Sequence, residues 1–200
     1  MHFDIQELPE NIAKDMQVNN IWNPDCPVSI DRLRLVYVSY YDFEGKIKLG
    51  QLITLDQVSE AVLRIFEGLI KLQFPIQSVK LINEYNGNDE LSMEANNSSC
   101  FNFRNIAGSK RLSMHSYGLA IDINPVQNPY IVIGENGSAD VFPKQGAEFL
   151  NRNNKRPGMV EPTVAIFHEN GFSEWGGHWN KPIDYQHFQV PRSKVDEFLV

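Results

Sequence analysis

The chain has 200 residues, of which 42% are hydrophobic and 22% charged, a composition typical of a globular protein with one substantial core. A formal net charge of −7 argues against a surface that binds the phosphates of nucleic acid. The sequence contains no run of about 18 apolar residues, so it predicts no transmembrane helix. The first residues also lack the charged-then-apolar layout of a secretion signal. We therefore expect a single domain over residues 1–200, with residues 1–30 as an N-terminal extension.

In the first half of the chain, the sequence predicts a hairpin followed by a helix. Residues 32–41 are rich in Leu, Val and Tyr, a turn follows at 42–45, and the alternation over 46–49 predicts a second strand. Thr54 and Gln57 have the spacing of a capping box at the start of a helix. The helix itself is predicted by an apolar stripe at helical spacing, which Pro75 ends; its members are Val58, Ala61, Val62, Ile65, Phe66, Leu69 and Ile70.

The second half of the chain predicts shorter elements separated by loops. We expect polar turns over 86–104 and a long loop from about 125 to 158, because both segments are rich in turn-forming residues. Pro162 and Gly171 are placed as at the two ends of a helix over 162–170. The mixture of elements predicts an α+β domain with antiparallel pairing. The remaining elements expected are strands over 77–85, 117–124 and 185–190 and a short helix over 193–199.

The two cysteines, Cys26 and Cys100, are too few for a disulfide scaffold or a cysteine zinc cluster. Pairing between them stays open from the sequence alone. Two unpaired thiols are the favoured interpretation.

The segment Ser113-Met114-His115-Ser116-Tyr117-Gly118-Leu119-Ala120-Ile121-Asp122 holds a first group of candidate site residues. Asp122 lies on a strand that is otherwise fit for burial, where a carboxylate needs a cation or hydrogen-bond donors. His115 precedes the strand and can fold back over Gly118 to share a metal ion with Asp122. Taken alone, the pattern fits equally a carboxylate that caps the turn toward Asn124.

A second group lies at Asp184-Tyr185-Gln186-His187, where His187 sits on a strand-like segment and Asp184 comes three residues earlier. A catalytic zinc site needs three protein ligands and an open position for water, with a carboxylate nearby to take the proton of that water. Glu174 and His178 form a rival pair of base and ligand, but Asp184 and His187 lead into a strand and are preferred.

Taken together, Ser-x-His-x-x-Gly-x-Ala-x-Asp and a later Asp-x-x-His resemble the LAS family of zinc peptidases. That family includes D-alanyl-D-alanine carboxypeptidases and dipeptidases, and L-alanyl-D-glutamate endopeptidases. The resemblance spans roughly residues 75–190, which we expect to form the catalytic core. It implies a small antiparallel sheet that bears a zinc site and is flanked by helices, as in the hedgehog and D-Ala-D-Ala peptidase type of fold.

The resemblance also implies roles for individual residues. His115, Asp122 and His187 become the Zn²⁺ ligands, and Asp184 becomes the general base. Arg104 matches an arginine that relatives carry near the metal, where it holds the carbonyl oxygen of the scissile bond. Three further residues are expected to contact substrate or line its pocket: Ser113, His178 and Trp175.

The function implied is a zinc peptidase that hydrolyses D-residue-containing peptides of bacterial peptidoglycan, as a carboxypeptidase or an endopeptidase. Stem peptides or muropeptides are the expected partners, and the periplasm or cell envelope is the expected location, although no export signal in the sequence supports it. Two alternatives stay open: a non-catalytic zinc-binding module of hedgehog-like fold, and a zinc amidase of the cell wall.

Overall fold

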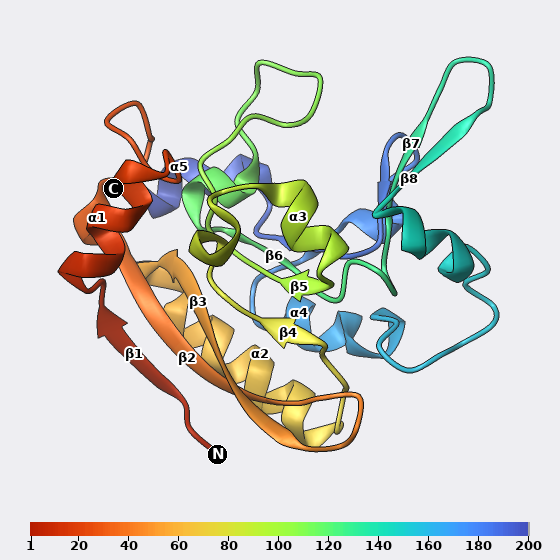
Figure 1. Cartoon of the computed structure of the whole chain (residues 1–200), viewed down its shortest axis with the longest axis horizontal. Coiled ribbons are helices and arrows are strands. Elements are labelled where there is room, and N and C mark those ends of the chain that lie inside the picture. The colour runs from red at the N-terminus through yellow and green to blue at the C-terminus, as the bar shows by residue number, and fades with distance from the viewer. Residues whose placement is uncertain (200) are drawn as a thin grey trace.

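The structure is a computed structural model that describes residues 1–199. Helices and strands are intermixed along the chain, and the sheets are small and mostly antiparallel. The coarse expectation of a mixed protein with small antiparallel sheets is confirmed. Figure 1 shows the sheet of β1, β2 and β3 with helix α2 on one side of the molecule, and β6 with the later helices beyond it.

The first sheet has the order β1-β2-β3 and is antiparallel throughout. The predicted hairpin at its centre is confirmed, and its turn is held by Asp42, whose Oδ1 accepts hydrogen bonds from the backbone N–H groups of Glu44 and Lys46. No strand or helix was assigned before residue 32, yet β1 and α1 form there, and Met16 of α1 is fully buried in the core. The elements are β1 (Asp4–Glu7), α1 (Glu10–Val18), β2 (Leu33–Tyr41) and β3 (Ile47–Leu55).

Helix α2 (Ser59–Lys71) packs its apolar stripe against β2, as predicted. Phe66 and Ile65 are fully buried, and each such side chain stabilises the fold by about 1.5–3 kcal/mol. The predicted capping box is wrong, because Thr54 belongs to β3 rather than to the helix. Its hydroxyl lies 2.8 Å from that of Ser59 and fixes the strand-to-helix junction from the strand side.

The segment after α2 differs most from expectation. The predicted strand over 77–85 is reduced to β4 (Ser78–Val79), which pairs in parallel with β5 (Asn97–Ser98), and residues 82–85 form a 3-10 helix. Helix α3 (Asp89–Glu94) forms where only turns were expected. Its start is capped by Asn88, whose side chain accepts a hydrogen bond from the N–H of Leu91.

A second small sheet has the order β6-β11-β9 and is antiparallel. Its core side is built on Phe188, whose ring stacks 3.9 Å from that of Phe167 in α4. The predicted helix over 162–170 is confirmed as a 3-10 turn followed by α4, and Gly171 follows it with φ +89°. The elements are β6 (Ala120–Asp122), β9 (Glu174–Trp175), β11 (His187–Gln189) and α4 (Val164–Glu169).

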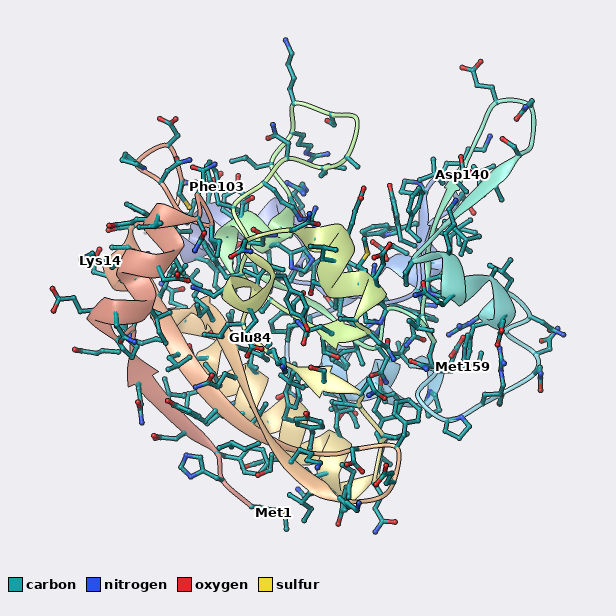
Figure 2. The ribbon with its side chains drawn as sticks, viewed as in Figure 1. Met1, Lys14, Glu84, Phe103, Asp140 and Met159 are labelled. Atoms are coloured by element: carbon teal, nitrogen blue, oxygen red, sulfur yellow. The ribbon has the colours of Figure 1, made fainter. Side chains whose placement is uncertain are left out.

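The segment interpreted as a long loop contains a hairpin, so that expectation is wrong over 130–142. Strands β7 (Tyr130–Ile133) and β8 (Ala139–Phe142) pair with β10 (Ile183–Asp184) in the order β10-β7-β8. This hairpin projects from the body of the protein (Figure 1), and Figure 2 labels Asp140 on it. The predicted C-terminal helix is confirmed as a 3-10 turn and α5 (Val195–Phe198).

Cys26 and Cys100 are both unpaired, as favoured from the sequence. Burial raises the pKa of the Cys26 thiol to about 11, so this thiol stays protonated at neutral pH. Within residues 1–199, no helix is long and apolar enough to cross a membrane.

Gly118 joins the first sheet to the segment that carries His115. It has φ +66°, and a Cβ atom at this position would lie 2.5 Å from the backbone N of Leu55. We expect Gly118→Ala to lower the free energy of unfolding by about 1–3 kcal/mol more than Gly137→Ala. Gly137 is the matched control, because its φ is +80° and nothing lies within 4 Å of its added Cβ. Urea unfolding measures both, and equal losses would contradict the backbone clash.

Candidate metal centre

Strand pairing brings Asp122 and His187 face to face. The two residues lie directly opposite each other in the register of β6 and β11, and their side chains meet with His187 Nδ1 2.9 Å from Asp122 Oδ1. His115 comes from the 3-10 helix Met114–Tyr117, just before β6. Its Nε2 lies 3.1 Å from Asp122 Oδ2 and 3.2 Å from His187 Nδ1. The structure therefore brings together the three residues expected to bind the metal.

The ring of His115 is fixed from outside this triad. Its Nδ1 lies at hydrogen-bonding distance from the carbonyl oxygen of Cys100, and only an N–H can donate there. The backbone is held as well, since Ser113 caps the short helix and its Oγ accepts from the N–H of His115. With the proton on Nδ1, the lone pair of Nε2 points toward Asp122 and His187.

The ring of His187 is fixed in the same manner by Gln189. Its Nε2 lies 2.9 Å from Gln189 Oε1, an acceptor, so the ring donates there and leaves the lone pair of Nδ1 inside the triad. The amide of Gln189 is itself oriented, because its Nε2 donates to the carboxylate of Glu174 on the neighbouring strand. Partners of this kind fix the tautomer of metal-binding histidines.

The donor set fits a metal ion. Two imidazole lone pairs and a carboxylate oxygen are all acceptors, and the three donor atoms lie within 4.8 Å of one another in a buried setting. Three acceptors that face each other away from water need a proton or a cation among them. Zinc in tetrahedral sites takes such nitrogen and oxygen ligands at about 2.0–2.2 Å, with a fourth position left open in catalytic sites.

Within the triad, Asp122 and His187 shift each other's pKa values. Burial alone would raise the pKa of Asp122, but the neighbouring His115 and His187 outweigh it and hold this pKa well below its usual range. Burial also opposes a charge on His187, but the hydrogen bond and negative charge of Asp122 raise the pKa of His187 to about 8. At neutral pH the metal-free site therefore holds a proton where a cation would bind.

Asp184 lies at the end of β10, whose register places it opposite Tyr130. Gly176 allows its close approach, because a Cβ on that glycine would lie 2.4 Å from the carbonyl oxygen of Asp184. Oδ1 of Asp184 is buried and has no hydrogen-bond partner within residues 1–199. Burial raises the pKa of Asp184 to about 7, with the charge of Asp122 as a smaller contribution in the same direction. A carboxyl group with this pKa can exchange a proton at neutral pH.

Arg104 is held by both its backbone and its side chain. Ser116 Oγ accepts from the N–H of Arg104 at 3.0 Å and donates to its carbonyl oxygen at 2.7 Å. Its guanidinium forms an ion pair with Asp89 at 2.9 Å. Nε of Arg104 is buried without an acceptor within residues 1–199, and the residue lines the cavity described next.

A cavity of about 700 Å³ contains these groups. Volumes of this size are usual for sites that bind small molecules and short peptides. Ser113 lines the cavity, as expected for a residue that contacts substrate, and Trp179 lines it too. The cavity also reaches the hairpin β7–β8 through Tyr130, Val132 and Phe142.

Two of the predicted pocket residues lie elsewhere. Trp175 is 7% exposed and packs in the core, where its ring stacks on that of Phe188 and its Nε1 donates to the carbonyl oxygen of Tyr185. His178 is exposed and contacts the edge of the Trp175 ring. Neither residue is among those that line the cavity, because the turn Gly176–His178 directs them away from it.

Sequence reasoning missed the partners that orient the histidines. Gln189 could have been found, because residues two apart on a strand share a face and Gln189 therefore lies beside His187. Glu174 was considered only as a rival base, whereas it holds the amide of Gln189. No sequence pattern identifies the carbonyl oxygen of Cys100 as the partner of His115, because its position depends on the path of the backbone after β5.

The fold and this donor set define a class of protein: an α+β protein with a buried His-Asp-His centre open to a cavity, the kind of site that zinc hydrolases use. Residues 107–190, less than half of the chain, match the family described as D-alanyl-D-alanine carboxypeptidase. The matched segment contains the triad and Asp184, and over this segment the resemblance to the LAS-type zinc peptidases is confirmed. No curated protein and no solved structure matches the chain.

Metal binding should release a proton from His187 and therefore depend on pH. Since the pKa of His187 is about 8 in the metal-free protein, the apparent affinity for Zn²⁺ should rise about tenfold per pH unit below pH 8 and level off above it. Competition with a chelator between pH 6 and 8.5 measures this slope. An affinity that is flat over that range would mean that His187 binds no proton in the metal-free site.

Removing the amide of Gln189 should weaken the metal site without disturbing its ligands. We expect Gln189→Leu to lower the affinity for Zn²⁺ about 10–100-fold, because the ring of His187 loses the acceptor that fixes it. The control is Gln57→Leu in the 3-10 turn just before α2, where the side chain is exposed, and it should leave the affinity unchanged. Equal affinities in the two variants would show that Gln189 does not orient the ligand.

Proposed function

We propose that this protein is a zinc-dependent peptidase that hydrolyses peptides with D-residues from bacterial peptidoglycan, as a D-alanyl-D-alanine carboxypeptidase or a related endopeptidase. The observation that carries the proposal is the convergence of the His-Asp-His triad, Asp184 and Arg104 on one cavity. The match of residues 107–190 to D-alanyl-D-alanine carboxypeptidases supports the substrate class. Stem peptides or muropeptides would then be the ligands, and the cell envelope the place of action.

His115, Asp122 and His187 would hold the zinc ion. When bound, zinc supplies a Lewis acid and lowers the pKa of a coordinated water to about 7. The triad gives the ion two neutral nitrogen ligands and one anionic oxygen, and the outward hydrogen bonds of both rings keep these atoms aimed inward.

Asp184 would carry the proton through the reaction. Its raised pKa lets it accept the proton of the attacking water and then donate it to the leaving amine. The residue lines the cavity, and its Oδ1 forms no hydrogen bond within residues 1–199 that would have to break first.

Arg104 would stabilise the negative charge that develops on the carbonyl oxygen of the cleaved bond. The residue lines the cavity and its backbone is fixed by Ser116, so the guanidinium is positioned before substrate arrives. Asp89 keeps the guanidinium in place through the ion pair. We propose that the chain has the hedgehog and D-Ala-D-Ala peptidase type of fold around this site.

Zinc content and hydrolysis of purified muropeptides test the proposal together. The wild-type protein should bind about one zinc ion and cleave, and His187→Ala should lose the metal. Asp184→Asn should keep the metal while its kcat falls about 10²–10⁴-fold. His178→Ala is the matched control, since that histidine is exposed outside the cavity, and it should retain both metal and activity.

The outcomes separate the proposal from its alternatives. Zinc binding without any cleavage would indicate a non-catalytic zinc module. Release of an intact stem peptide from the sugar would indicate an amidase. Loss of metal in His178→Ala rather than in His187→Ala would overturn the ligand assignment.

A further inference from the structure

Two of the arginines that line the cavity form no ion pair with a carboxylate of the described residues. Arg104, Arg111 and Arg192 all line it, and Arg104 is paired with Asp89. Within residues 1–199, neither Arg111 nor Arg192 forms an ion pair. In a chain with a net charge of −7, two such unpaired cations at one cavity mark a place suited to an anion.

Arg192 and Asp184 lie beyond opposite ends of β11 in the chain. Along β11 the cavity-facing residues are His187 and then Gln189, and the chain reaches Arg192 three residues later, whereas Asp184 precedes β11. Arg192 is five residues from His187, so their Cα atoms are at most about 18 Å apart. A substrate segment of a few residues can span that length.

The position of Arg111 is fixed by the loop that carries it. Its carbonyl oxygen accepts from the N–H of Ile106 at 2.8 Å, and the bridge between Asn105 and Leu112 closes the loop. This loop projects from the body of the protein (Figure 1) and lines the cavity with Ile106 and Ala107. Two residues after Arg111, Ser113 caps the helix of His115, so the arginine is tied to the metal centre through a short rigid segment.

The positive charges of Arg111 and Arg192 repel each other. Burial, and after it the charge of Arg111, lower the pKa of Arg192. Tyr117 and Glu174 act in the opposite direction and offset this only in part. A ligand anion between the two guanidinium groups would remove the repulsion and give both groups an acceptor.

We infer that Arg111 and Arg192 form a subsite that binds a carboxylate group of the substrate within the cavity of the triad. The planar guanidinium fork matches a carboxylate with two parallel hydrogen bonds. This inference rests on the proposed peptidase function, and it makes substrates with a free carboxylate preferred over their amides. The carboxylate is either the C-terminus of the peptide or the side group of an acidic residue within it.

The test uses the pentapeptide L-Ala-D-Glu-L-Lys-D-Ala-D-Ala in four forms, with either carboxylate, both or neither converted to the amide. Binding to zinc-loaded Asp184→Asn protein is measured by calorimetry, and kcat and KM are measured on the wild type. Amidation of the bound carboxylate should raise Kd about 10–100-fold. Comparison of the two singly amidated peptides then shows whether the subsite binds the C-terminal carboxylate or the internal one.

Arg111→Gln and Arg192→Gln should each weaken binding of the free carboxylate, and amidation should then have almost no further effect. In the active enzyme these substitutions should raise KM and leave kcat nearly unchanged, because the subsite is remote from the reacting bond. Arg64→Gln is the control, since Arg64 is exposed on α2 and bonds only to Asn170. Zinc content and thermal unfolding of each variant establish that the fold is retained.

The outcomes separate this inference from the proposed function. Cleavage with equal Kd for all four peptides, or an amide effect that persists in both arginine variants, would overturn the subsite while the peptidase stands. Arginine-dependent binding of the carboxylate forms without any cleavage would support the subsite and overturn the peptidase. Absence of both binding and cleavage would overturn the two together.

Discussion

The pairing of β6 with β11 is the constraint on which the rest of the site depends. It places Asp122 opposite His187, although the two residues are 65 positions apart in the chain. Side chains alternate along a strand, so Gln189 falls on the same face as His187 and reaches its outer nitrogen. A slip of β11 by one residue would turn His187 and Gln189 to the core side and bring Phe188 into the cavity. The stack of Phe188 on Phe167 opposes such a slip, so core packing fixes the register that builds the metal centre.

Two carboxylates close to each other in this cavity have opposite character because their surroundings differ. Asp122 faces two imidazole rings, which keep its pKa far below that of an ordinary aspartate. Asp184 has one oxygen without a partner, and burial raises its pKa to about 7. One group is therefore a permanent anion that attracts a cation, and the other can exchange a proton near neutral pH. Two carboxyl groups whose pKa values are shifted in opposite directions are what acid–base chemistry at pH 7 requires.

The local parts of the site could be predicted from the sequence, and the non-local parts could not. His115 folds back toward Asp122 because Gly118 adopts a left-handed conformation only four residues before that carboxylate, and this is visible in the motif. The hairpin of β7 and β8 was taken for a loop because its strands have four residues each and flank a turn rich in Gly and Asn. Trp175 was expected in the cavity, but which side of a short strand faces the core depends on packing partners elsewhere in the chain.

The position of Trp175 explains how Asp184 is held relative to the candidate metal centre. Asp184 belongs to the sheet β10-β7-β8 and His187 to the sheet β6-β11-β9, and Tyr185 and Gln186 are the two residues between them in the chain. Those two residues are fixed from three directions. Trp175 donates to the carbonyl oxygen of Tyr185, the guanidinium of Arg152 lies 4.3 Å from the Tyr185 ring, and Ile123 donates to the carbonyl oxygen of Gln186. A buried tryptophan outside the cavity thus helps to hold the carboxyl group of one sheet at a fixed distance from the imidazole of another, which is the alignment that proton transfer needs.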